Sequence, residues 1–338
     1  MRRSLFILGA LLLLLSACGA GQPSSASFAP AEEERLVVYT SHEEAVYGPI
    51  IKEFEDRTGI WVQVETGGTG ALLDRIAAEA ASPACDLLFG GGADTLQSRP
   101  ELFEPYVSPL NGTVLPDFRC PDGTWTAFSS LPVVLIYNPM LIRSNPPDSW
   151  RSLLDPAWRG KIAFASPAVS GSSYTALAAL LQVLPGEDGE LLAAFSRNLD
   201  GQILESSSQV TGAVADGTCY IGAVPEDAAL QAIADGRDVA LLFPKEGTCV
   251  LPDGMAVVQN CRHGDNARRF IDFALSEDVQ RYLLESCSRR SVRGDLKREE
   301  EGFFDFDSFD YDTAWAGEQR EALLAQWRAL WGGGEDAE

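Results

Sequence analysis

The chain has 338 residues, enough for one large domain or for two lobes that each bury a core of their own. Its formal charge at pH 7 is −23, from 26 Lys and Arg against 49 Asp and Glu. A body this acidic repels phosphate backbones and anionic lipids, which argues against nucleic acid as a partner and against a polybasic membrane contact. The charge does not exclude a small anion held by local dipoles.

Residues 1–17 have the features of an export signal. A cationic start, MRRS, is followed by an apolar run that includes Leu11–Leu15, and then by small residues that end at Cys18. The apolar run is too short to span a bilayer comfortably, so these residues are excluded from the fold. The sequence Leu-Ser-Ala-Cys resembles a bacterial lipobox, which implies cleavage before Cys18, lipidation of its thiol and a membrane anchor. The alternative is an ordinary signal peptide with an incidental cysteine.

Residues 18–34 are small and polar, and they predict a flexible stalk before a folded body that starts near Arg35. No later apolar run approaches the length of a transmembrane helix. We expect four further segments: a first lobe over 35–128, a second lobe over 129–249, a return to the first lobe over 250–296, and a C-terminal segment with a terminal helix over 297–338.

The first half alternates strands and helices. The β-branched run 36–40 predicts a strand, and Val46, Ile50 and Phe54 then recur at helical spacing up to Gly59, a typical C-cap. A strand at 60–66, a helix at 71–80 and a short strand at 86–89 follow. This alternation predicts an α/β fold around a largely parallel sheet, in which ligands gather at the carboxyl ends of the strands. The turns 41–44, 66–70 and 90–94 lie at those ends.

The second half repeats this alternation. A strand at 132–138 is followed by strands at 161–165, 202–205, 219–224 and 238–243, with helices between them. A strand at 255–259 and helices at 265–275 and 277–286 then indicate a return to the first lobe. Two crossings of the chain between lobes predict a hinge.

Six cysteines remain after Cys18. Export to an oxidising compartment favours disulfides for an even number of cysteines, although six allow 15 pairings. We expect Cys85 with Cys120, Cys219 with Cys249 and Cys261 with Cys287, since these partners are nearest in sequence within a lobe. No C-x-x-C spacing occurs and the only histidines are His42 and His263, so neither a metal site nor a cofactor is predicted.

Small hydroxyl residues and glycines crowd three predicted helix starts. They occur in TGGTG (66–70), VSGSSYT (169–175) and ESSSQVT (205–211). One reading is that each cluster only caps its own helix. The other is that three helix starts face one cleft, where their free N–H groups and hydroxyls hold an oxyanion without any Lys or Arg. The candidate binding residues from these clusters are Gly68, Thr69, Ser172, Ser173, Ser207 and Ser208.

Further candidates follow other strands. Ser41 and His42 come after the first strand, where the histidine could donate to an oxyanion or ligate a metal, and Gly91 follows the third. Glu226 and Asp227 follow the strand 219–224, where they could accept from sugar hydroxyls or a ligand ammonium. The alternative is that these two carboxylates only favour the first turn of their helix.

Residues 35–295 resemble the solute-binding proteins of ABC importers, in the type II branch that includes ferric-ion, phosphonate and hexose-phosphate binders. The resemblance rests on 36–76, on 149–177 and on 270–280, in the order found in the family. It implies two α/β lobes with a hinge, which close on a ligand as a monomer and deliver it to a membrane permease. The ferric binders hold iron with paired adjacent tyrosines, and this chain has Pro225, Glu226 and Asp227 in about that place.

The sequence therefore favours a lipid-anchored binding protein for a small anionic solute that bears phosphate or phosphonate, with no bond chemistry of its own. Ferric iron is the alternative ligand. A secreted hydrolase is a further alternative, but the G-x-S-x-G elbow is absent and neither histidine has a recognisable nucleophile beside it.

Overall fold

We analysed a computed structural model, which describes residues 30–296 and 306–331. The signal segment, Cys18 and most of the expected stalk lie outside the described residues. The described residues from Glu33 onward form one compact unit. Over the described ranges, no helix combines the length and the apolar character needed to cross a membrane.

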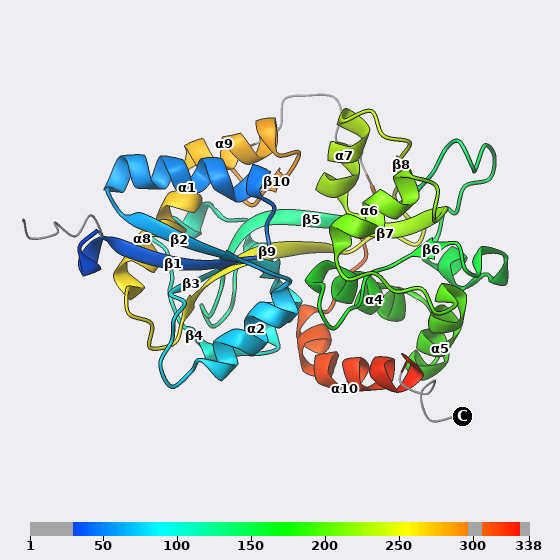
Figure 1. Cartoon of the computed structure of the whole chain (residues 1–338), viewed down its shortest axis with the longest axis horizontal. Coiled ribbons are helices and arrows are strands. Elements are labelled where there is room, and N and C mark those ends of the chain that lie inside the picture. The colour runs from blue at the N-terminus through cyan, green and yellow to red at the C-terminus, as the bar shows by residue number, and fades with distance from the viewer. Residues whose placement is uncertain (1–29, 297–305, 332–338) are drawn as a thin grey trace, which may run out of the picture. The chain divides into compact units, whose positions relative to one another are not determined.

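Helices and strands alternate along the described chain, as expected for an α/β fold (Figure 1). The strands are β1 (Arg35–Thr40), β2 (Trp61–Thr66), β3 (Leu87–Gly92), β4 (Phe103–Glu104), β5 (Thr126–Tyr137), β6 (Ile162–Ala163), β7 (Ile221–Pro225), β8 (Ala240–Leu242), β9 (Val250–Val258) and β10 (Arg290–Ser291). The helices are α1 (Glu44–Thr58), α2 (Thr69–Ala78), α3 (Ala93–Gln97), α4 (Gly171–Val183), α5 (Asp188–Leu199), α6 (Ser207–Ala215), α7 (Glu226–Ala234), α8 (Gly264–Ala274), α9 (Glu277–Ser286) and α10 (Thr313–Trp331).

The sheet runs in the order β2-β1-β3-β9-β5-β7-β6. Strands β1, β2 and β3 are parallel, as the alternating pattern predicts, but β5 and β9 are antiparallel to their neighbours. Strand β5 pairs with β9 from Thr126 to Pro132 and with β7 from Val133 to Tyr137. These two long strands connect the two halves (Figure 1), so the sheet is mixed rather than largely parallel.

The two halves have separate cores. In the first half, Phe54, Phe89 and Phe270 pack edge to face between β1, β3, α1 and α8. In the second half, Tyr174 and Phe195 belong to a cluster that α4 and α5 bury. This is the expected two-lobe arrangement; the lobe limits at 128/129 and 249/250 stay a prediction, and they fall within β5 and at the start of β9.

Local signals set the ends of several elements. Gly59 ends α1 with φ of 73°, and its N–H donates to the Glu55 carbonyl at 2.9 Å. The strand expected at 202–205 is reduced to one bridge between Ala165 and Leu204, because α6 begins only three residues after Leu204. The expected terminal helix is α10, which packs against α3 and α5.

The three expected disulfides are not formed in the structure, where all six described cysteines are free thiols. Cys219 and Cys249 pack into different hydrophobic clusters of the second half, so nearness in sequence did not bring them together. Burial raises the pKa of Cys249 and of Cys85, which keeps both thiols protonated and inert in the structure.

Candidate functional site

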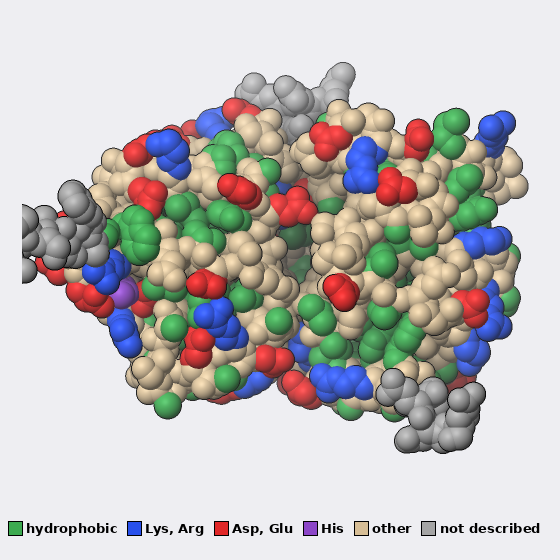
Figure 2. Space-filling model, in the orientation of Figure 1, with side chains coloured by type: hydrophobic (Ala, Val, Ile, Leu, Met, Phe, Trp, Pro, Cys, Tyr) green, Lys and Arg blue, Asp and Glu red, His purple; other side chains and the backbone are tan. Residues whose placement is uncertain are grey.

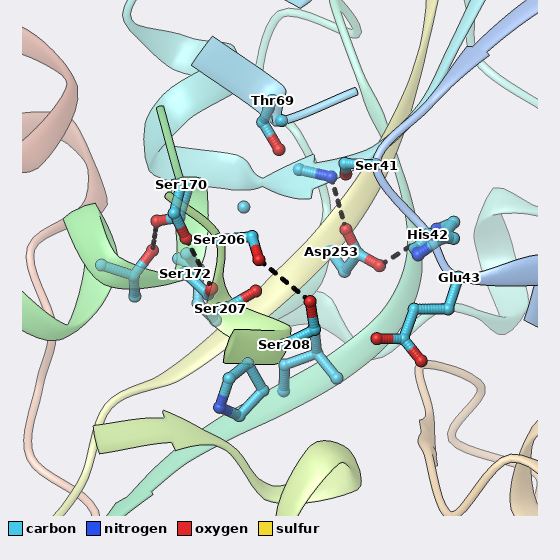
Figure 3. Close-up of a pocket in the computed structure, with 18 of the residues that line it drawn as sticks. Ser41, His42, Glu43, Thr69, Ser170, Ser172, Ser206, Ser207, Ser208 and Asp253 are labelled. Atoms are coloured by element: carbon cyan, nitrogen blue, oxygen red, sulfur yellow. Dashed lines mark hydrogen bonds and ion pairs between the residues drawn. The ribbon is translucent and has the colours of Figure 1, made fainter. Parts of the chain in front are cut away.

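A cavity of about 270 Å³ lies between the two halves. Figure 2 shows the molecular surface hollowed at this place, and Figure 3 shows its lining side chains. Most of the predicted binding residues line it: Ser41, His42, Gly68, Thr69, Gly91, Ser172, Ser207 and Ser208. The other three, Ser173, Glu226 and Asp227, do not.

One side of the cavity is formed by the first residues of α2, α4 and α6. We call this the helix-start wall; it comprises Gly68, Thr69, Ser170, Gly171, Ser172, Ser206, Ser207 and Ser208. Helix N-termini carry unpaired N–H groups and a partial positive charge. Three of them therefore direct positive potential at one small volume.

Few of these hydroxyls act as helix caps. The Ser170 hydroxyl accepts from the N–H of Ser173 at 3.3 Å, so it caps α4, whereas neither Gly68 nor Ser206 makes a side-chain cap bond. The Ser172 hydroxyl lies 3.2 Å from that of Ser170, and Ser208 lies 3.0 Å from Ser206. The hydroxyls at positions 172, 207 and 208 thus lie beside the cavity without capping a helix.

Glycines allow the two halves to meet closely beside the helix-start wall. A Cβ on Gly68 would lie 2.5 Å from the Val169 carbonyl oxygen, and one on Gly70 would lie 2.4 Å from that of Ala168. The N–H of Gly70 donates to the Val169 oxygen at 3.4 Å. Backbone therefore contacts backbone here, which only glycine permits.

The opposite side of the cavity is formed by ionisable side chains. We call His42, Asp253 and Arg289 the charged wall. Asp253 Oδ1 accepts from the N–H of Gly91 at 2.7 Å, and its Oδ2 accepts from Arg289 Nη1 at 2.9 Å and lies 3.3 Å from His42 Nε2. Figure 3 shows Asp253 between Ser41 and His42.

Burial controls the protonation of this wall. It lowers the pKa of His42 well below its ordinary value, with the Arg289 charge acting in the same direction, so the imidazole is neutral at pH 7. Burial also raises the pKa of Asp253 to about 6, against the opposing effects of Arg289 and of the Gly91 N–H. The carboxylate remains mostly ionised at pH 7 and bound to Arg289.

Glu226 and Asp227 bind arginines instead of facing the cavity. Glu226 is 2 % exposed and accepts two bonds from Arg290, at 2.7 and 2.9 Å. Asp227 Oδ2 lies 2.8 Å from Arg289 Nη2. Arg289 is therefore held by two carboxylates, Asp227 and Asp253, which offset its charge.

The sequence analysis did not identify Arg289 or Asp253 as site residues. Arg289 lies in the short run Ser-Arg-Arg-Ser at 288–291, and adjacent arginines in so acidic a chain were the available signal. Asp253 lies inside β9, where no local pattern marks it. Glu43 and Glu205 also line the cavity, and both are exposed.

The cavity has few metal-binding groups. The described part of the chain contains no cluster of three or more His, Cys, Asp or Glu side chains that could hold a metal ion. The cavity lining includes no tyrosine and no cysteine. Asp253 is the carboxylate that lies beside His42 Nε2.

Known proteins share this fold. A structure of the periplasmic binding protein AfuA from Actinobacillus pleuropneumoniae, with exogenous fructose-6-phosphate bound, has a TM-score of 0.82 at 24% identity, covering 88% of this chain and 98% of that chain. This likeness establishes the two-lobe fold of type II periplasmic binding proteins.

Two relatives have higher sequence identity. Iron uptake protein A1 of Synechocystis is 30% identical over 81% of this chain and 80% of its own length. A probable ABC transporter periplasmic-binding protein of Sinorhizobium fredii is 30% identical over 74% of this chain and 72% of its own. The model of the bacterial extracellular solute-binding protein family matches residues 80–302. The chain therefore belongs to the bacterial extracellular solute-binding proteins.

Proposed function

We propose that this protein is the exported binding component of an ABC importer, and that its solute carries an oxyanion such as a phosphate or phosphonate group. The observation that carries this proposal is the convergence of three helix N-termini on one cavity. Free N–H groups at helix starts bind anions without a cationic side chain. The sugar phosphate bound in AfuA is consistent with a ligand of this kind.

The charged wall supports an oxyanion at the helix starts rather than beside Arg289. Both terminal nitrogens of Arg289 already bind carboxylates, at 2.8 and 2.9 Å. A second anion there would compete with Asp253 and Asp227 for the same donors. The helix-start wall itself contains no carboxylate, and the two other acidic side chains of the lining, Glu43 and Glu205, are exposed.

Capture and release would follow from closure of the two lobes. The solute favours the closed form only to the extent that it binds this form more tightly than the open form. The closed protein then docks on the permease, as a monomer and without changing any bond in the solute. Lipidation at Cys18 would keep it near the membrane.

Ferric iron is the second candidate, and a specific observation favours it: the 30% identity to an iron uptake protein. Hard oxygen ligands are available from Glu43, Glu205 and Asp253 in the lining. Against it, Asp253 is occupied by Arg289 and Gly91, and no tyrosine lines the cavity.

A thermal-shift screen tests the proposal. The mature protein would be heated with fructose 6-phosphate, inorganic phosphate, 2-aminoethylphosphonate or ferric citrate, and with fructose and citrate as controls. A bound solute at 100 times its dissociation constant adds about 2.7 kcal/mol of stability. We expect stabilisation by at least one phosphorus oxyanion and none by fructose. Stabilisation by ferric citrate alone would replace the proposal with the iron alternative.

A further inference from the structure

Arg320 in α10 is a buried cation with unsatisfied donors. The residue is 6 % exposed, and no described group accepts a hydrogen bond from its Nε or its Nη2. A guanidinium stays charged in proteins, and burying a charge without a hydrogen-bonded partner costs several kcal/mol. The Tyr174 ring and the charge of Asp94 offset part of this cost, but the two nitrogens remain without a hydrogen-bond acceptor.

Arg320 lies beside the first turns of two helices of the helix-start wall. Its Nη2 is 3.3 Å from the place that a Cβ on Gly70 would take, in the first turn of α2. Its guanidinium carbon is 5.0 Å from the ring centroid of Tyr174, in the first turn of α4. It does not line the cavity, so its charge acts on a solute through space.

A buried carboxylate lies behind the same wall. Asp94 Oδ2 accepts from the hydroxyls of Thr175 at 2.8 Å and Tyr311 at 2.7 Å, and Thr175 lines the cavity. Asp94 Oδ1 accepts from the N–H of Thr95 at 2.6 Å. None of these three bonds comes from Arg320, whose charge interacts with Asp94 through space. The carboxylate nevertheless repels an anion in the cavity, and a nearby cation offsets that repulsion.

The α10 helix holds Arg320 firmly in this place. The Tyr174 hydroxyl donates to the Ala316 carbonyl, and a Cβ on Gly317 would lie 3.2 Å from the Asp94 carbonyl oxygen. One turn and two turns further on, Leu323, Leu324 and Trp327 are buried in the core of the second half. Figure 1 shows α10 running below α4 towards α5. A helix fixed at both ends leaves Arg320 little freedom to turn towards solvent.

We propose that Arg320 is a specificity-determining residue of the oxyanion site, which supplies positive potential to the starts of α2 and α4 from outside the cavity. This inference rests on the proposed function, since it presumes an oxyanion at those helix starts. The C-terminal helix thereby becomes part of the binding site, although none of its side chains touches the solute. Arg289 lines the cavity, but the two carboxylates bound to its terminal nitrogens offset its charge, so it suits this role less well.

The test is calorimetric titration of Arg320→Met with fructose 6-phosphate. We expect about tenfold weaker binding, the effect of one charge removed at a distance of several ångströms in a medium of intermediate dielectric constant. Arg320→Lys keeps the charge and should recover most of the affinity. The matched control is Arg159→Met, which removes an exposed arginine paired with Asp200 and should leave affinity unchanged. Added salt should not abolish the difference, because buried charges are screened little.

Two further readouts separate an electrostatic role from a structural one. By ³¹P NMR, the second pKa of the bound phosphate, which is about 6 when free, should rise by about one unit in Arg320→Met relative to wild type. The unfolding temperatures of Arg320→Met and Arg320→Lys without solute show whether the fold is intact, so that a loss of affinity can be distinguished from a loss of folding.

Equal affinities and an equal phosphate pKa in wild type and Arg320→Met would overturn this assignment while leaving the proposed function intact. Failure of Arg320→Lys to recover affinity in a folded protein would also overturn it. If Arg320→Met does not fold, the Lys variant and its phosphate pKa decide the question. Absence of fructose 6-phosphate binding to wild type, together with failure of inorganic phosphate and 2-aminoethylphosphonate, would overturn the proposed function and this assignment together.

Discussion

The two walls of the cavity hold charge in different ways. The helix-start wall presents backbone N–H groups and serine hydroxyls that remain available to a solute. The charged wall contains full charges, but Asp253 and Asp227 bind both terminal nitrogens of Arg289, whose Nε has no acceptor among the described residues. We therefore expect the wall without ionised side chains to be the better anion site, because no carboxylate of the structure binds its N–H and O–H donors.

The largest change in unfolding free energy is expected when one partner in the charged wall is removed. Asp253→Ala leaves the Arg289 guanidinium and the Gly91 N–H without their shared acceptor, in a site that is nearly dry. Breaking a buried pair in this way costs about 3–5 kcal/mol. Urea unfolding should show this loss. The matched variant Asp148→Ala, from an exposed pair with Lys245, should cost less than about 1 kcal/mol. Similar losses in both variants would contradict the account of the charged wall.

Crowding the place where the halves meet should weaken binding without weakening the fold. In Gly70→Ala the new methyl group would lie 2.4 Å from the Ala168 oxygen, so the closed form becomes strained by about 1–3 kcal/mol. The affinity measured by calorimetry should fall about tenfold or more. Helix α2 itself gains from alanine, so the unfolding temperature without solute should fall little.

The matched control for this variant is Gly48→Ala in α1, where the nearest atom to the new methyl group is Glu44 Cγ at 3.5 Å. This change should leave affinity unaltered. A loss of affinity in Gly48→Ala equal to that in Gly70→Ala would show that the effect is not due to contact between the halves.

Two neighbouring serines of α4 differ in whether they line the cavity, so they can separate a role in binding from a role in the helix. Ser172 lines the cavity, whereas Ser173 is 2 % exposed and lies outside the lining. Ser172→Ala should weaken binding of an oxyanion about tenfold or more, since a hydrogen bond to a charged group is worth about 1.5–3 kcal/mol. Ser173→Ala should leave affinity within about twofold, because Ser170 still caps the helix through the backbone N–H of residue 173. Titration of both variants with the solute found in the screen checks this difference, and equal effects would contradict it.

The smallest effect concerns pH. The pKa of Asp253 is about 6 in the folded protein and near 3.9 when unfolded, so the native state binds more protons between these values. Its contribution therefore stabilises the fold as pH falls from about 6 to about 4. His42 acts in the opposite direction, because its lowered pKa makes the unfolded state take up the proton below about 6.5.

Difference curves isolate these opposing effects. Relative to wild type, Asp253→Asn should lose stability as pH falls through this window, and His42→Gln should gain it. Unfolding free energies from pH 7 to pH 4 provide the measurement. Curves for both variants that run parallel to wild type would refute the assigned protonation states.

The sequence alone predicted the fold class and most of the helix-start wall, for a physical reason. The residues at each helix start are neighbours in the chain, so Gly67–Thr69, Ser170–Ser173 and Ser206–Ser208 can be recognised locally as helix starts. Asp253 and Arg289 could not be predicted in this way, because they meet only when β9 and the segment after α9 come together in the fold, whereas His42 was named for its place after the first strand. The same holds for Arg320, whose burial depends on how α10 packs against both halves.

The central claim is that an oxyanion is held by backbone N–H groups at the helix-start wall. Amide ¹H–¹⁵N NMR of the wild-type protein, titrated with fructose 6-phosphate and separately with inorganic phosphate, tests it most directly. The account predicts large downfield shifts of the amide protons at the starts of all three helices, at Thr69, Ser172 and Ser208, with smaller changes at His42. Shifts confined to the charged wall, with unchanged amides at positions 69, 172 and 208, would contradict it.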